Sequence, residues 1–274
     1  MKLFELDAYT PSEIASKVES VGVAKARLST LQTLMLGVVA GGFIALGALY
    51  YTLVISDPQL SFAAARVLGG VVFSLGLILV VVAGAELFTG NNLLVMAWAD
   101  GKVTTSELLR NWTLVYLANA AGAISFSILV YLSHHADMNN GAVGLAYIKI
   151  AAAKTALPFL EAFFKGVLCN LLVCLAVWLA LAGHTVTDKI LAIIFPISAF
   201  VAAGFEHSIA NMYFIPLGIF LKSNATATVE VDVTTLDWAH FAGNLIPVTL
   251  GNIVGGSVLV ALVYYTIYRR GSGT

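Results

Sequence analysis

Two short polar segments interrupt long apolar stretches of the chain: GAELFTGNN at residues 84–92 and GFEHSIANM at residues 204–212. Each segment places a glutamate, Glu86 or Glu206, two residues after a glycine. A charged side chain at the centre of a bilayer costs roughly 2.5–3.5 kcal/mol or more. The two segments therefore mark a candidate functional site at membrane depth, and the second one adds a histidine, His207.

His207 is the histidine that these stretches place at membrane depth, because the other four fall in predicted loops: His134, His135, His184 and His240. Imidazole titrates near neutral pH and can donate a hydrogen bond or a proton. A bare anion crosses an apolar barrier only at a large desolvation cost, whereas a neutral weak acid crosses more easily. If a small anion reaches this depth, His207 could therefore relay a hydrogen bond or a proton to it. Glu86 and Glu206 are predicted to be structural, since a carboxylate repels anions.

Other kinds of site find little support in the residue pattern. Ser208 adjoins His207, but neighbouring residues of a helix point about 100° apart, and the chain has no G-x-S-x-G motif. No second histidine lies at metal-ligand spacing. The Asn-Pro-Ala pair of aquaporins is absent from both polar segments. We therefore predict no enzyme, no metal and no cofactor, and interpret Cys169 and Cys174 as packing residues.

The composition indicates an integral membrane protein. Of the 274 residues, 59% are hydrophobic and only 11% are charged, far below the roughly 25% charged residues of a soluble domain. The net charge of −1 gives no reason to expect a nucleic-acid partner. Runs of about 20 apolar residues can span a bilayer, and six runs are present: 31–55, 65–99, 107–133, 157–182, 188–221 and 244–268. These predict an all-α protein with six transmembrane helices, of which the second and fifth are broken.

The N-terminal segment has its own helix signal. TPSE at residues 10–13 is a capping box with proline at the first helical position, and Ile14 and Val18 then share a face. We predict an amphipathic helix on the membrane surface within residues 1–30, followed by one channel domain over residues 31–270. The first 28 residues are polar, so no cleavable signal peptide is expected. Residues 223–243 are predicted to form the one long connection.

The distribution of basic residues predicts the orientation. Nine of them fall on the side of the N-terminus and four on the other side, which favours cytoplasmic termini. The nine are Lys2, Lys17, Lys25, Arg27, Lys102, Arg110, Lys189, Arg269 and Arg270, and the four are Arg66, Lys149, Lys154 and Lys222.

Short segments of the first half of the chain recur in the same order in the second half. Three matches recur at offsets of 129, 120 and 133 residues: Ala24-Lys25 with Ala153-Lys154, the two Gly-x-Glu segments, and Asn119-x-x-Gly122 with Asn252-x-x-Gly255. Each half, about 25–135 and 154–268, holds three spans, so the second half must insert upside down, as in many transporters. Lys25 and Lys154 would then stand at opposite mouths of one pathway and attract anions. Alternatively, both are interfacial anchors.

These features together resemble the formate/nitrite transporter family. The resemblance runs from the first matched lysine to the last span, and six segments carry it: FSLGLIL at 73–79, ELFTG at 86–90, AKT at 153–155, FKGVLCNLLVCLAVW at 164–178, GFEHSIANM at 204–212 and NLIPVTLGN at 244–252. It implies a homopentamer of aquaporin-like protomers in the inner membrane of a prokaryote. Each protomer would have its own pore for small monovalent anions.

The resemblance also implies roles for individual residues. His207 would be the central pore histidine, with Thr89 as its partner from the other break. The remaining chamber residues would be Asn170, Asn211, Asn252 and Glu206. Phe73, Leu77 and Phe200 would form one apolar constriction, and Leu87, Phe88 and Val173 the other. Lys154 and Lys25 would stand in the two vestibules.

The anion itself is less clearly specified. ELFTG and the FFKG segment at 163–166 are similar to nitrite-type members, whereas NLIPVTLGN and the first constriction are similar to formate-type members. Formate is the leading expectation, followed by nitrite and then by hydrosulfide or lactate. Passage through the pore would be either channel-like or proton-linked.

Overall fold

The computed structural model describes residues 8–222 and 231–270, and every regular element in these ranges is a helix. Six helical segments there are long and apolar enough to cross a membrane, which confirms the predicted fold class. They are Thr30–Ile55, Phe62–Gly84, Thr105–Leu132, Phe159–Ala182, Val186–Ala203 and Trp238–Tyr268.

The elements have the following bounds in chain order. The first half consists of α1 (Pro11–Ala26), α2 (Thr30–Ile55), α3 (Phe62–Phe73), α4 (Leu75–Ile78), η1 (Leu79–Gly84), η2 (Gly90–Leu93), α5 (Leu94–Ala99), α6 (Thr105–Leu132) and η3 (His135–Asp137). The second half consists of α7 (Ala142–Thr155), α8 (Phe159–Ala182), α9 (Val186–Ala203), α10 (Ser208–Leu221), α11 (Trp238–Ile253), η5 (Val254–Leu262) and α12 (Val263–Tyr268).

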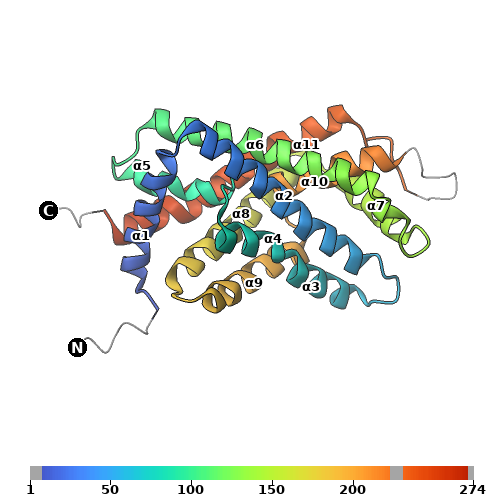
Figure 1. Cartoon of the computed structure of the whole chain (residues 1–274), viewed down its shortest axis with the longest axis horizontal. Coiled ribbons are helices and arrows are strands. Elements are labelled where there is room, and N and C mark those ends of the chain that lie inside the picture. The colour runs from blue at the N-terminus through green and yellow to red at the C-terminus, as the bar shows by residue number, and fades with distance from the viewer. Residues whose placement is uncertain (1–7, 223–230, 271–274) are drawn as a thin grey trace.

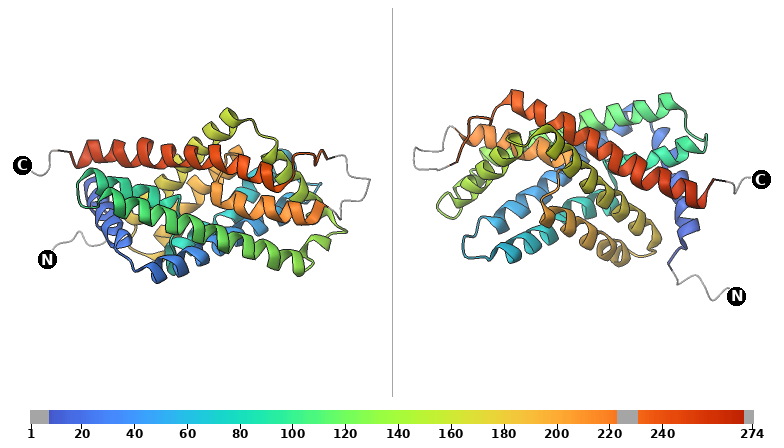
Figure 2. Two further views of the ribbon diagram at one scale, coloured as in Figure 1. Left: turned by 90° about the horizontal axis from the view of Figure 1, so that it is seen from above. Right: turned by 180° about the vertical axis from the view of Figure 1, so that it is seen from behind.

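The two halves pack as an inverted repeat. Helix α2 lies along α6, and α8 lies along α11 in the same way, while α3 and α9 meet where the halves join (Figures 1 and 2). The close crossings depend on matched glycines. A side chain at Gly122 would collide with the carbonyl of Val38, and one at Gly255 with the carbonyl of Val167. The predicted repeat is therefore confirmed.

Both predicted helix breaks are present. The first interrupted span ends at Gly84, with φ +86°, and resumes as η2 and α5. Helix α9 ends at Ala203 and is followed by Gly204, with φ +76°, before α10 begins at Ser208. A positive φ is accessible to glycine without steric cost. Each glycine therefore stops its helix and turns the following residues, including Glu86 or Glu206, toward the protein interior.

Helices α1 and α7 lie at opposite ends of the molecule (Figure 1). The capping box of α1 is formed by Thr10 and Glu13, and its buried face contacts α5, α8 and α12. The sequence analysis did not predict α7, because its 14 residues are too short to span a membrane. The repeat could have revealed it, since Lys154 stands near the end of α7 as Lys25 does near the end of α1.

One predicted boundary was wrong. Helix α11 begins at Trp238, where the Asp237 side chain accepts a hydrogen bond from the backbone N–H of His240, so the connection expected over 223–243 is shorter. This capping pattern was overlooked because the apolar run starts later. Residues 223–230 of that connection, and Lys2 with the rest of residues 1–7, lie outside the described residues.

Candidate functional site

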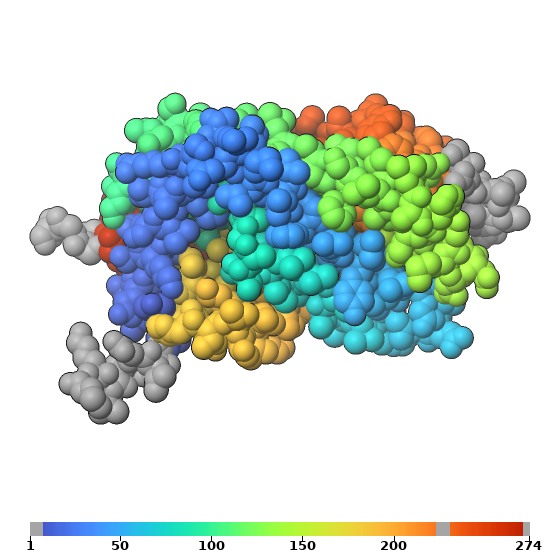
Figure 3. Space-filling model, in the orientation of Figure 1, coloured from blue at the N-terminus to red at the C-terminus, as the bar shows by residue number. Residues whose placement is uncertain are grey.

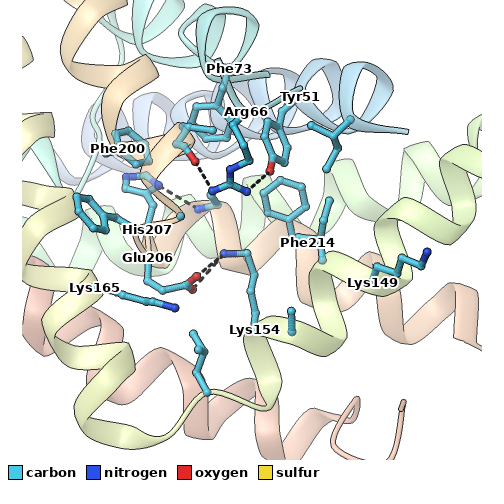
Figure 4. A pocket seen from close by; sticks show the side chains of 18 residues that line it. Tyr51, Arg66, Phe73, Lys149, Lys154, Lys165, Phe200, Glu206, His207 and Phe214 are labelled. Carbon is cyan, nitrogen blue, oxygen red and sulfur yellow. Dashed lines mark hydrogen bonds and ion pairs between the residues drawn. The ribbon is translucent and has the colours of Figure 1, made fainter. Parts of the chain in front are cut away.

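Two pockets reach into the protein from opposite ends. The α7-side pocket has a volume of about 370 Å³, and Arg66, Lys154, Glu206 and His207 are among its lining residues (Figure 4). The α1-side pocket has a volume of about 340 Å³, and its lining includes Lys25, Leu77, Glu86 and Asn91. It corresponds to a hollow between α1, the α4 region and the end of α8 (Figure 3). The two pockets share no lining residue.

A charged network holds the helix break at the α7-side pocket. Lys154 Nζ lies 2.9 and 3.1 Å from the two carboxylate oxygens of Glu206. Asn211 Nδ2 donates to Glu206 Oε2 and to Asn244 Oδ1, both at 2.7 Å. Asn244 Nδ2 in turn donates to the carbonyl of Lys154 at 2.8 Å. The network ties α7, the break, α10 and α11 together.

The α1-side pocket contains a matching network. Lys25 Nζ donates to Glu86 Oε1 at 2.8 Å and to Asn91 Oδ1 at 3.0 Å. Asn91 Nδ2 donates to Glu86 Oε2 at 2.7 Å and to Asn111 Oδ1 at 3.0 Å, and Asn111 Nδ2 donates to the carbonyl of Lys25 at 3.3 Å. Both lysines predicted for the vestibules are thus paired with a buried glutamate. The positive charge of either lysine is largely balanced.

Two asparagines clamp the backbone of the breaks. Asn119 accepts from the Phe88 N–H at 2.9 Å and donates to the carbonyls of Gly37 and Glu86 at 2.7 and 2.8 Å. The matching contacts of Asn252 are with the Ser208 N–H at 3.0 Å and with the carbonyls of Gly166 and Glu206 at 2.9 and 3.0 Å. Because both polar atoms of the Asn252 side chain are used in this way, the structure places it in the framework of the chamber.

His207 and Thr89 come together from the two breaks. His207 Nε2 lies 2.9 Å from Thr89 Oγ1, and both residues are buried. The other ring nitrogen, Nδ1, accepts the backbone N–H of Ala210 at 3.2 Å and so caps α10. In a neutral imidazole only one nitrogen carries a proton. The proton therefore resides on Nε2, where it can be donated to Thr89 or to a molecule that replaces the threonine as partner.

Apolar side chains close the space between the two pockets. The rings of Phe73 and Phe200 meet edge to face with centroids 5.8 Å apart, and Phe200 lies 6.0 Å from the His207 ring. Leu87 and Leu77 line the α1-side pocket, so Leu77 does not share a pocket with Phe73 and Phe200, beside which it was predicted. All four are buried. Phe88 and Val173 are buried as well, but they are not among the lining residues of either pocket, and Phe88 packs against Trp112 and Tyr116.

Two chamber amides keep an unpaired oxygen within the described part of the chain. Asn170 Nδ2 donates to the carbonyls of Thr89 and Asn252 at 3.2 and 2.7 Å, and its Oδ1 is buried without a partner. Asn211 Oδ1 is also unpaired. The repeat counterpart of Asn211 is Asn91, whose Oδ1 accepts a hydrogen bond from Lys25 Nζ. The α7-side network is therefore the less completely satisfied of the two.

The sequence analysis missed four residues of this site: Asn91, Asn111 and Asn244 in the networks, and Arg66 in the α7-side pocket. The repeat contained the signal for the asparagines. Asn91 and Asn211 match at the offset of 120 that relates the glutamates, and Asn111 and Asn244 match at the offset of 133 found for Asn119 and Asn252. Arg66 has no such signal, because its repeat partner is Val186.

The comparison with known proteins agrees with this arrangement. The profile of the formate/nitrite transporter family matches residues 12–266. The chain belongs to the formate/nitrite transporter family. It is 41% identical to the formate channel FocA of Escherichia coli K12 over 96% of both chains, and 38% identical to a probable formate transporter of Methanothermobacter thermautotrophicus, covering 95% of this chain and 97% of the other.

Solved structures of family members have the same fold. A pentameric formate channel with formate bound matches with a TM-score of 0.81 and 40% identity, covering 87% of this chain and 97% of the other. An ion channel of the family matches with a TM-score of 0.82 and 29% identity, covering 93% and 98%. The sequence-based assignment to this family is confirmed.

Proposed function

We propose that the chain carries formate, a small monovalent anion, across a membrane through a pore within each protomer. The observation that carries this proposal is the His207–Thr89 pair, which lies between two pockets that open at opposite ends and are separated by apolar side chains. The formate channels and transporters to which the chain is 38–41% identical support formate as the anion. Their near full-length alignment with this chain supports it further.

The apolar barrier explains why a histidine is needed. Burying an isolated carboxylate in an apolar environment costs far more than burying a neutral polar group. The aromatic rings of Phe73 and Phe200 cannot donate a hydrogen bond to a carboxylate. An anion that receives a hydrogen bond or a proton beside the barrier crosses it at a much lower cost.

His207 can supply that hydrogen bond. Its Nδ1 is engaged by Ala210, so the Nε2–H points toward Thr89 and the centre of the chamber. In the proposed mechanism, formate takes the place of the threonine oxygen as acceptor. The Thr89 hydroxyl then donates a hydrogen bond to the second formate oxygen. Full proton transfer requires the imidazolium, so Nδ1 must first release the Ala210 N–H and take up a proton from water. Transfer of the Nε2 proton to formate then gives formic acid and a neutral ring, whose Nδ1 proton returns the ring to its resting form by moving to Nε2 through solvent.

The assembly and orientation form part of the proposal. The pentameric solved relative supports an assembly of five protomers. We place the pentamer, with one pore in each protomer, in the inner membrane of a prokaryote, and formate channels of bacteria are among its relatives. The basic residues near α1 and α12 favour the α1-side pocket as the cytoplasmic one, with the α7-side pocket outside. Light scattering of the purified protein in detergent would measure the number of protomers.

Reconstitution of the full-length protein into liposomes tests the proposed function. We expect uptake of labelled formate that unlabelled formate suppresses most strongly, with nitrite, hydrosulfide and lactate as competitors. Empty liposomes provide the baseline. Swelling in sucrose or glycerol without formate uptake would contradict an anion pathway, and stronger suppression by nitrite would reassign the anion.

A further inference from the structure

Arg66 reaches from α3 to the end of α9 at the wall of the α7-side pocket (Figure 4). Its Nε donates to the carbonyl of Ala202 at 2.8 Å and its Nη2 to the carbonyl of Val201 at 2.9 Å. Its Nη1 donates to the Tyr51 hydroxyl at 3.2 Å. A guanidinium has five N–H groups, so two remain, one on each terminal nitrogen.

The carbonyls that Arg66 holds belong to the last turn of a broken helix. The last carbonyls of a helix lack intrahelical partners and carry a partial negative charge. Left alone, they would repel an anion in the pocket beside them. Arg66 donates to two of them, of which the Val201 carbonyl also accepts the Gly204 N–H at 3.1 Å, and adds a positive charge at the same place. Gly204 leaves the room for this, since a Cβ there would lie 2.9 Å from Arg66 Nη2.

Among the described residues, no side chain caps the α1-side break in a comparable way. A Cβ at Gly84 would meet no heavy atom within 4 Å. The residue that matches Arg66 in the repeat is Val186, which is exposed at the start of α9. Arg66 is therefore an addition to the repeated framework, confined to one of the two pockets.

Arg66 is also the unbalanced cation nearest the break within the described part of the chain. Lys154 is paired with Glu206 at 2.9 Å, and Lys165 is paired with Glu161 at 2.7 Å. Lys149 is exposed at the rim. No carboxylate of the described residues forms an ion pair with Arg66.

We propose that Arg66 is a docking residue for a planar anion with two oxygens, which binds in the α7-side pocket before it reaches His207. A guanidinium matches the two oxygens of such an anion in a fork-like pair of hydrogen bonds. This site rests on the proposed function, since it identifies where the transported anion first binds. It makes flux from the α7 side more sensitive to ionic strength than flux from the α1 side.

Substitution of Arg66 by glutamine tests the site. Glutamine can keep one hydrogen bond to the end of α9 but carries no charge. The matched control is Arg110→Gln. Arg110 also donates to a backbone carbonyl, that of Leu28 at 3.3 Å, but lines neither pocket. Initial formate flux from the α7 side would be measured in liposomes of known insertion direction, with gluconate as the background anion.

At an ionic strength of about 10 mM, where charges act over roughly 30 Å, R66Q should reduce the initial rate about fivefold, mainly through a higher KM, as one unit charge near 4 Å in water predicts. At about 1 M the reduction should be less than twofold. R110Q should match wild type at both. R66K keeps the charge and should retain most of the rate at low ionic strength. An unchanged rate in R66Q, or a loss equal at both ionic strengths, would overturn the site.

A binding measurement separates this site from the transport proposal. Purified wild-type protein should broaden the NMR line of ¹³C-formate, and R66Q should reduce that broadening while R110Q leaves it intact. Wild-type liposomes without formate uptake would refute the proposed function alone. Equal broadening by wild type and R66Q would refute the site, whatever the flux.

Discussion

The two ends of the molecule hold their broken helices with the same side chains but line their pockets with different ones. At each break a lysine, a glutamate and two asparagines form one network, and a further asparagine clamps the backbone. The residues that the repeat pairs across the pockets differ in character. His207 matches Leu87, Arg66 matches Val186, and Lys165 matches Leu36.

This difference separates the framework from the pore. A break at membrane depth leaves backbone groups unpaired, and each half must satisfy them in the same way. The repeated networks meet that requirement. Residues that deviate from the repeat are free to serve transport, and they gather at the α7-side pocket. The chain is therefore symmetric in the residues that stabilise it and asymmetric in the residues that we propose contact the anion.

The sharpest test of the shared networks is removal of each glutamate's charge. Breaking a buried ion pair by removing one partner costs about 3–5 kcal/mol, and we expect Glu206→Gln to lower stability by that amount. Glu86→Gln should lower stability less, because Lys25 still donates a hydrogen bond to Asn91 Oδ1. The Lys25 side chain is also 28% exposed to solvent, whereas that of Lys154 is 14% exposed. Unfolding in mixed detergent micelles measures both. An equal or larger loss in Glu86→Gln would contradict the comparison.

Helices α1 and α7 offer a second test, because they are attached differently. The buried Glu19 of α1 binds Lys102 at 2.7 Å and Arg269 at 3.0 Å, whereas its repeat counterpart in α7 is the buried Ile148. Glu19→Gln should speed amide hydrogen exchange in α1 about tenfold, which corresponds to about 1.4 kcal/mol. Exchange in α7 should not change, and equal acceleration of both helices would refute the difference.

The same attachment has a predictable pH dependence. The hydrogen bonds that Lys102 donates to the carboxylates of Asp100 and Glu19 raise its pKa above the ordinary value. A raised lysine pKa adds stability that is complete below the unfolded-state value and is lost as the pH rises through the folded one. The protection factors of the α1 amides, which correct for the base catalysis of exchange, should therefore stay constant through neutral pH and fall only in strongly alkaline solution. A fall in these protection factors between pH 6 and 8 would contradict this account.

The two breaking glycines provide the smallest expected effect. Alanine at either position must adopt a positive φ, which costs about 1 kcal/mol. Gly84→Ala should cost no more than that, since the space around it is open. Gly204→Ala should cost more and should slow formate flux, because the new methyl group displaces Arg66. Equal effects of the two substitutions on stability and flux would argue against the arginine cap.

Much of this architecture could be predicted from the sequence, because it depends on local signals. Apolar runs, the Gly-x-Glu breaks and the TPSE capping box each act through neighbouring residues, and all were found in the structure. The ordered self-matches gave the inverted repeat. The motifs around His207 also gave the family, which its profile confirms.

The missed features depend on contacts between distant segments. The pairing of each lysine with a glutamate joins residues 61 and 52 positions apart, so the lysines read in sequence as free charges. Helix α7 is stabilised by packing against α10 instead of by a long apolar run. Arg66 lies 136 positions from the Ala202 carbonyl that it binds. Such contacts can be identified only once the three-dimensional fold is known.

Whether a proton enters together with formate is the most direct test of the proposed His207 relay. Asparagine can cap a helix as well as the imidazole does but cannot titrate. The substitution His207→Asn therefore removes the group that would relay the proton and preserves the N-terminal cap of α10. In liposomes containing a pH dye, wild-type formate influx should acidify the interior and accelerate as the external pH falls. In the variant both responses should vanish, and an unchanged pH dependence of formate flux would contradict the relay.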